Sequence, residues 1–232
     1  VVVIDDASDR GALSSMPRRL PGGTPLRFGR RETSLGAACR NDAAAMASAP
    51  WLLMLDDDSW PMDAGFLSIA AGAAADVAVI GLDIRLPGER REAGGLPEVH
   101  VGCGALIRTE AFRAAGGYDA SFHYYVEEYD LAARLLARGW RIRHDIRSTV
   151  IHEKVAANRS MDVILERLVR NNGWVIARHA PASVRETELA AMLERYERIA
   201  LKEDAIRGWR RGRSALEATI GVQPHRPLEP AL

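Results

Sequence analysis

The sequence predicts an α/β protein whose sheet is largely parallel in the first half of the chain and mixed in the second. Short apolar runs predict strands, and alanine-rich or amphipathic segments between them predict helices. Strands and helices alternate up to about residue 82, which favours parallel pairing. After residue 99 the β segments have fewer helices between them, which favours a mixed sheet.

Apolar runs define the predicted strands in chain order. The first is β-branched and ends at Asp5-Asp6, and the third ends at Asp56-Asp57-Asp58. Between them, prolines and glycines make residues 7–34 a loop region with one short strand. The predicted strands span residues 1–4, 26–28, 51–55, 77–82, 99–107, 141–144 and 149–152.

Helices are predicted where breakers are absent and where caps bracket a segment. An alanine-rich segment that ends before Pro50 predicts the first helix, and Pro61 predicts the start of the second. Thr109 is the predicted N-cap of a short helix, and Gly139 is the predicted C-cap of the next. The predicted helices span residues 35–48, 62–74, 109–116, 126–138, 161–178 and 185–207.

Charge and cysteine content exclude several classes of function. The 31 Lys and Arg residues balance 31 Asp and Glu residues, so a general nucleic-acid binder is not expected. The two cysteines, Cys39 and Cys103, are too few for a disulfide framework and lack metal-ligand spacing, which fits the cytoplasm. No apolar run is long enough to predict a transmembrane segment. The sequence begins on Val1 without Met, and we expect the natural chain to begin earlier.

Acid clusters follow two of the predicted strands, at the positions where open α/β sheets bind ligands. Adjacent carboxylates in Asp56-Asp57-Asp58 repel one another unless a cation or hydrogen-bond donors share their charge. Mg²⁺ accepts one or two carboxylates and completes its shell with water and phosphate oxygens. The cluster therefore predicts a divalent cation and a diphosphate ligand, and the alternative is a solvated acidic turn.

A third acid group, Glu127-Glu128, begins the helix predicted at 126–138. The helix dipole favours an ionised carboxylate at this end, and a fixed, ionised carboxylate suits a general base. Asp130 and Arg134 lie four residues apart and predict a structural ion pair. The alternative for the whole group is an ordinary helix N-terminus.

Four motifs in order over residues 1–155 resemble the family-two glycosyltransferases of the GT-A fold. They are Val3-Ile4-Asp5-Asp6-Ala7-Ser8-Asp9, Gly36 with Arg40-Asn41, Trp51–Asp58 with its D-x-D, and Gly104–Gly139 with Glu127-Glu128-Tyr129-Asp130-Leu131. The resemblance implies a Rossmann-like, mixed but mostly parallel sheet flanked by helices. It makes residues 1–155 the catalytic core and residues 156–232 a C-terminal helical extension packed on that core.

The resemblance also implies roles for individual residues. Asp5, or alternatively Asp6, would read the base of a nucleoside-diphosphate sugar, and Arg40 would help to hold the nucleotide. The acidic cluster would serve the ribose, the diphosphate and Mg²⁺ or Mn²⁺, with Asp58 and Asp56 as metal ligands and Asp57 beside them. His152 would be a further ligand of the metal or phosphate.

Glu128 aligns with the carboxylate that acts as base in this family, and Glu127 is the competing candidate. The implied activity is an inverting transfer of a sugar to a hydroxyl of a glycan, a lipid-linked glycan or a small molecule. Two departures stand out: the family's base is usually Asp, and the family's first strand-helix unit is missing here.

These departures keep other readings open. The first is a non-catalytic sugar-nucleotide or glycan-binding relative, and the second is a metal-dependent phosphatase. The basic, aromatic segment Trp209–Arg213 is either a solvated end or a peripheral contact with the inner face of the membrane.

Overall fold

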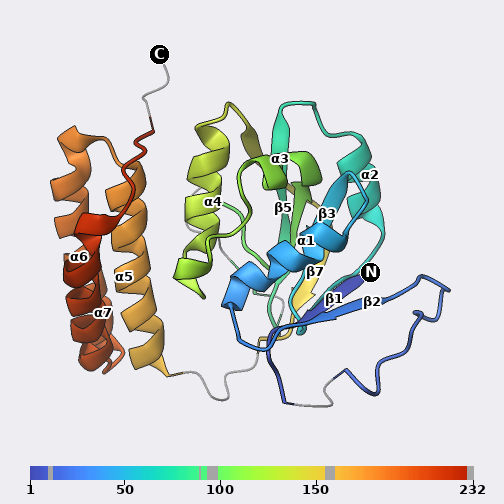
Figure 1. The fold of residues 1–232 in the computed structure, drawn as a ribbon, viewed down its shortest axis with the longest axis horizontal. Helices are drawn as coiled ribbons and strands as arrows, with labels where there is room; N and C mark the ends of the chain where they lie inside the picture. The colour runs from blue at the N-terminus through green and yellow to red at the C-terminus, as the bar shows by residue number, and fades with distance from the viewer. Residues whose placement is uncertain (10–12, 89, 93–98, 155–159, 229–232) are drawn as a thin grey trace.

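A five-stranded mixed sheet with the order β3-β6-β5-β7-β4 forms the centre of the fold (Figure 1). The computed structural model describes residues 1–9, 13–88, 90–92, 99–154 and 160–228. The five strands are β3 (Trp51–Met54), β4 (Ser59–Pro61), β5 (Val77–Arg85), β6 (Ala105–Arg108) and β7 (Arg141–His152). A separate parallel pair lies beside it, formed by β1 (Val2–Asp5) and β2 (Arg27–Arg30).

The predicted class is confirmed: the chain is an α/β protein with a mixed sheet flanked by helices and a C-terminal helical extension. Parallel pairing is less prevalent than predicted. In the described part of the chain it joins β1 to β2 and β5 to β7, whereas β3–β6, β5–β6 and β4–β7 are antiparallel. Parallel neighbours need a long crossover, usually a helix, and no helix lies between β5 and β6 within the described residues.

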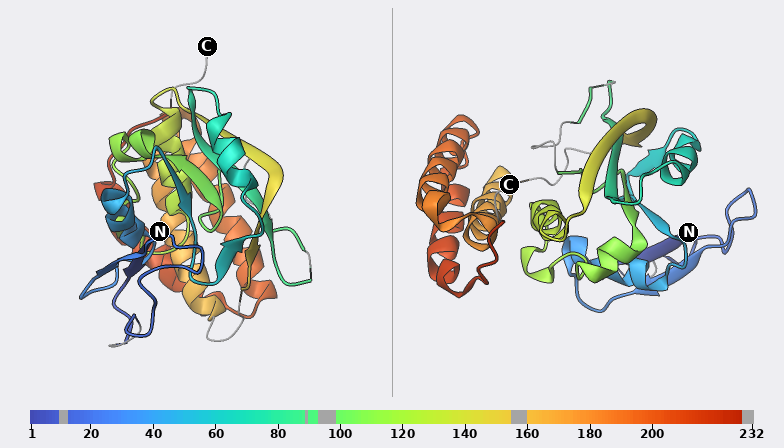
Figure 2. Two further views of the ribbon diagram at one scale, coloured as in Figure 1. Left: turned by 90° about the vertical axis from the view of Figure 1, so that its right-hand side faces the viewer. Right: turned by 90° about the horizontal axis from the view of Figure 1, so that it is seen from above.

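Helices cover both faces of the sheet, as two views in Figure 2 show. The face of β5 that carries Val79 packs against α1, α3 and α4, and the face that carries Ile80 packs against α2. The helices are α1 (Arg40–Met46), α2 (Gly65–Ala71), α3 (Thr109–Ala114) and α4 (Glu127–Leu136), with short 3₁₀ turns η1 (Gly36–Cys39) and η2 (Ala120–Phe122). Pro61 ends β4 instead of starting a helix, and the strands predicted at 141–144 and 149–152 are one strand.

Three helices, α5 (Met161–His179), α6 (Ala182–Lys202) and α7 (Ile206–Thr219), follow the core, and α5 lies next to α4 (Figure 1). The sequence predicts only two helices here, because Gly208 and Gly212 are poor helix formers. Both glycines lie where α7 meets α5: a Cβ on Gly208 would stand 2.1 Å from the Asp162 carbonyl oxygen. The chain therefore uses glycine to bring two helix backbones together.

Trp209 lies on α7 and is only 7% exposed, packed among the apolar residues of the three helices. The indole ring is therefore not available at the surface, and a peripheral membrane contact of the segment Trp209–Arg213 stays a prediction. In the described part of the chain, no helix combines the length and the apolar character that a membrane span needs.

Asp130 on α4 joins the core to α5. It is 2% exposed, and its carboxylate accepts hydrogen bonds from Arg134 at 2.8 Å, Arg178 at 3.1 Å and His179 at 3.0 Å. Burial acts to raise the pKa of Asp130, but the His179 hydrogen bond and the two arginine charges lower it to about 2. The predicted pair with Arg134 is confirmed, and the two partners from α5 add to it.

Replacing Asp130 with alanine is expected to lower the free energy of unfolding by about 3–5 kcal/mol, because it leaves buried cationic partners uncompensated. Urea denaturation measures the loss. Glu194→Ala is the matched control, since it removes an exposed pair with Arg198 on α6 and should change little. Because the folded pKa is depressed, the wild-type contribution is present above about pH 4 and fades as the pH falls towards 2. Equal losses in both variants would contradict this account.

Candidate active site

Asp5 and Asp6 lie at the carboxyl end of strand β1, as the sequence predicts. Asp5 is 5% exposed, and it accepts a 2.8 Å hydrogen bond from the Ser8 N–H and another from Arg30. The Ser8 hydrogen bond and the Arg30 charge outweigh burial and hold the pKa of Asp5 below its usual range. Asp6 accepts a 2.8 Å hydrogen bond from the Gly36 N–H. Both acids are held by the protein itself, and their contact with a nucleotide base stays a prediction.

Arg40 and Asn41 begin α1 and point in two directions. The Arg40 guanidinium pairs with the Asp56 carboxylate. Burial disfavours the charged form of Arg40, but the Asp56 charge outweighs it and raises the pKa of Arg40. Asn41 makes two hydrogen bonds to the backbone of Tyr118, in the turn after α3. Its Nδ2 donates to the Tyr118 carbonyl oxygen at 2.8 Å, and its Oδ1 accepts from the Tyr118 N–H at 2.9 Å. Arg40 thus faces the acidic cluster, whereas Asn41 fixes the backbone behind it.

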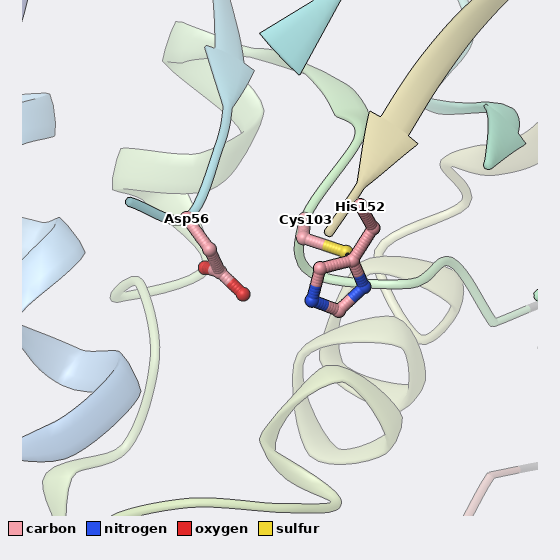
Figure 3. A group of neighbouring side chains, drawn as sticks. All are labelled: Asp56, Cys103 and His152. Carbon is pink, nitrogen blue, oxygen red and sulfur yellow. The ribbon is translucent and has the colours of Figure 1, made fainter. Parts of the chain in front are cut away.

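Asp56, Cys103 and His152 bring three potential metal donors together (Figure 3). One donor atom from each lies within 4.8 Å of the other two. The antiparallel pairing of Met54 with Ala105 explains the meeting of the first two, since Asp56 lies two residues after Met54 and Cys103 lies two residues before Ala105. In Figure 3 the Asp56 carboxylate points towards the His152 ring, and the Cys103 sulfur lies beside that ring.

Asp58 reaches the same histidine through the pairing of β4 with β7, in which Ser59 stands opposite His152. The Asp58 Oδ1 lies 3.3 Å from the His152 Nε2. On the other side of the ring, the Glu92 Oε2 lies 2.6 Å from Nδ1. A carboxylate on one ring nitrogen fixes the histidine and leaves the other nitrogen for a ligand. Asp57, between the two other aspartates, is exposed.

Glu127 and Glu128 form the first turn of α4. Glu127 is 5% exposed, and its Oε2 is buried without a hydrogen-bond partner. Glu128 accepts a hydrogen bond from the Gly102 N–H at 3.2 Å. A Cβ on Gly102 would stand only 2.8 Å from the Glu128 Oε1, so glycine permits this close approach.

Both glutamates have raised pKa values. Burial, and next the charge of Glu128, raise the pKa of Glu127 to about 8. Burial also raises the pKa of Glu128, against the backbone hydrogen bonds and the Arg40 charge that favour its ionised form. That this carboxylate is held ionised stays a prediction, because burial raises its pKa while the backbone hydrogen bonds lower it. A raised pKa brings a carboxylate closer to the value that suits a base at neutral pH.

Cys103 and Glu92 are members of the site that the sequence did not predict. Cysteine spacing alone gives no metal motif, because the partners come from distant strands. The signal that could have found Cys103 is the antiparallel register between residues 51–54 and 105–108. No comparable signal exists for Glu92, which follows β5 and reaches the site through its own side chain.

The fold is similar to that of three solved glycosyltransferases of the GT-A type. Mannosyltransferase PcManGT from Pyrobaculum calidifontis, in complex with GDP-Man and Mn²⁺, matches with a TM-score of 0.57 at 15% identity, over 95% of this chain and 65% of its own. S. aureus TarS in complex with UDP-GlcNAc gives 0.56 at 15%, over 84% and 63%. GalNAc-T7 with UDP, GalNAc and Mn²⁺ gives 0.64 at 14%, over 95% and 51%.

The chain has the GT-A fold. By sequence it matches no family model and no curated protein. It spans about half to two thirds of the length of these three structures. In this GT-A fold the acidic cluster after β3, the histidine that ends β7 and the glutamates of α4 lie around one end of the sheet.

Proposed function

We propose that the chain is an inverting glycosyltransferase, which moves a sugar from a nucleoside-diphosphate sugar to an acceptor hydroxyl. One observation carries the proposal: on a GT-A fold, a set of metal donors gathers near two adjacent carboxylates, the buried Glu127 and the partly buried Glu128. Arg40 links the two groups, because its charge acts on Asp56 and on both glutamates. This combination provides a place for a diphosphate and a base for an acceptor.

The donor set fits a divalent cation. Asp56, Asp58 and His152 offer the carboxylate oxygens and imidazole nitrogen that such ions accept, and the carboxylate of Glu92 orients the histidine. Cys103 offers a sulfur atom, a donor that favours Zn²⁺ more than Mg²⁺, but burial raises the pKa of its thiol. When bound, Mg²⁺ or Mn²⁺ neutralises the charge that develops on the leaving diphosphate.

Glu128 is the proposed base, and Glu127 is the alternative. Removal of the acceptor proton lets the hydroxyl oxygen attack the anomeric carbon in a single displacement, which inverts the configuration. The bond to the diphosphate breaks as the new glycosidic bond forms, and the proton stays on the carboxylate. Glu127 lies beside Glu128, and its charge state is linked to that of its neighbour.

A thermal-shift panel tests donor and metal binding. UDP-, dTDP- and GDP-sugars are compared with and without Mn²⁺, Mg²⁺ and Zn²⁺. A matching donor at about 100 times its Kd, with metal, is expected to raise the Tm by roughly 5–10 °C, because it binds only the folded state. PcManGT and TarS were solved with guanosine and uridine donors respectively, so the panel covers both bases. No shift with any donor and metal pair would contradict the proposal.

The release of nucleoside diphosphate separates an enzyme from a non-catalytic sugar-nucleotide-binding relative. Turnover that depends on an added acceptor identifies a transferase. Binding without turnover across glycan, lipid-linked and small-molecule acceptors identifies the binding protein.

A further inference from the structure

A strained loop, residues 122–126, runs directly into the Glu127–Glu128 pair. His123, Tyr125 and Val126 have φ angles of 61°, 72° and 74°. Residues other than glycine rarely adopt this region of backbone conformation. Val126 is β-branched and is the N-cap of α4, where no side chain caps the helix. Such a backbone persists only where surrounding contacts hold it.

Asn171 of α5 supplies those contacts. Its Nδ2 lies 3.1 Å from the carbonyl oxygen of Phe122, 3.0 Å from that of Tyr124 and 2.7 Å from that of Tyr125. The side chain is 0% exposed, and its Oδ1 accepts a hydrogen bond from Arg170 at 2.9 Å. The two N–H donors of one amide therefore serve three carbonyl oxygens of the strained loop.

The opposite side of the loop contacts η1. The Ala37 N–H donates to the His123 carbonyl oxygen at 2.7 Å. A Cβ on Gly36, which has a φ of 61°, would stand 2.2 Å from that same oxygen. The loop is thus held between η1 on one side and α5 of the C-terminal extension on the other. In the chain, η1 lies between Leu35 and Arg40.

We propose that Asn171 is a positioning residue for the Glu127–Glu128 pair. By holding three carbonyl groups of the strained loop, it fixes the first turn of α4 and therefore the place where the acceptor hydroxyl meets the carboxylate. This inference rests on the proposed function. It assigns to the C-terminal helices a part in the acceptor step. Among the described residues, the hydrogen bonds of Asn171 go to the strained loop and to Arg170, not to the metal donors or to the acids that follow β1.

Asn171→Ala tests the inference, and Asn172→Ala is its matched control. Asn172 is the next residue of α5, and its Nδ2 donates to the Leu168 carbonyl oxygen and to the Tyr196 hydroxyl, both within the helical extension. Asn171→Ala is expected to lower kcat by about 10²-fold while the donor KM stays within about twofold, since a small displacement of a reacting group has effects of that size. Asn172→Ala should leave both constants near wild type.

Hydrogen exchange gives a second measurement that needs no substrate. Amides of residues 125–130 should exchange faster in Asn171→Ala than in Asn172→Ala, and those of β5 should be unchanged in both. Asn171→Ser, which keeps one hydroxyl donor, replaces the alanine variant if that does not fold, and should give a smaller effect in the same direction. Unchanged exchange at 125–130, or equal changes in both asparagine variants, would overturn the inference. If wild type transfers no sugar, the proposed function fails while the exchange result still decides the role of Asn171.

Discussion

Replacing Glu128 with glutamine is expected to lower the rate of sugar transfer by about 10²–10⁴-fold, the usual effect of removing a general base. Glutamine keeps the size of the side chain and can still accept the hydrogen bond from the Gly102 N–H, but it cannot take the acceptor proton. Donor affinity should change little, because the loss falls in the transition state. Steady-state kinetics with the donor identified by the thermal-shift panel measures both quantities.

Three variants sharpen this test. Glu128→Asp places a carboxylate one methylene shorter and should retain more activity than Glu128→Gln. Glu110→Gln is the control. It removes an exposed acid from the first turn of α3, a helix N-terminus that has no proposed role in catalysis. If Glu127→Gln loses activity and Glu128→Gln does not, the base is Glu127. Near-normal transfer by the double variant Glu127→Gln/Glu128→Gln would show that neither glutamate takes part in the reaction.

The pH profile of the wild-type rate should reflect the same pair. Both glutamates have pKa values raised by burial, so each holds its proton to a higher pH than an exposed glutamate. The base must be ionised to act, and the rate should therefore rise as the pH rises through the pKa of the pair.

Asp58→Ala is expected to weaken metal-dependent donor binding by more than about 10²-fold, since loss of even an outer-shell partner costs about 10–100-fold. The fold should stay intact, because the Asp58 side chain is about one-third exposed and its contact is with the His152 ring. Calorimetric titration of the donor with and without Mn²⁺ measures the effect. Asp76→Ala, which removes an exposed acid paired with Arg141, is the control. Binding by Asp58→Ala as tight as wild type would show that the metal ligands lie elsewhere.

The sequence predicted the parts of the fold that local pattern controls. The buried strand β5 and the helix α4 lie close to where they are predicted, because each is marked by a local pattern of apolar residues. The antiparallel pairing of β6 between β3 and β5 was not predictable from alternation alone. Helix α7 was missed because Gly208 and Gly212 act through a neighbouring helix, which no local propensity records.

Some residues of the candidate site are likewise predictable from local sequence, and others depend on how the strands pair. The D-x-D acids and Glu127–Glu128 follow from residue types at strand and helix ends. The pairing of Asp58 with His152 depends on which strand lies beside β4, and Cys103 depends on the register of β6. The raised pKa values of the glutamates depend on burial in the folded protein, which the local sequence does not show.

The pairing of β4 with β7 has a consequence for how the molecule assembles. Asp58 and His152 lie far apart in the sequence, and their meeting requires β7, the last core strand, to dock beside β4, a strand from the first half of the core. Contacts of this kind form late, since the chain must first close a long loop. A divalent cation would therefore find its ligands only after the folding transition state. Added metal should act on the kinetics of unfolding, slowing the loss of the native state while leaving the refolding rate nearly as it is.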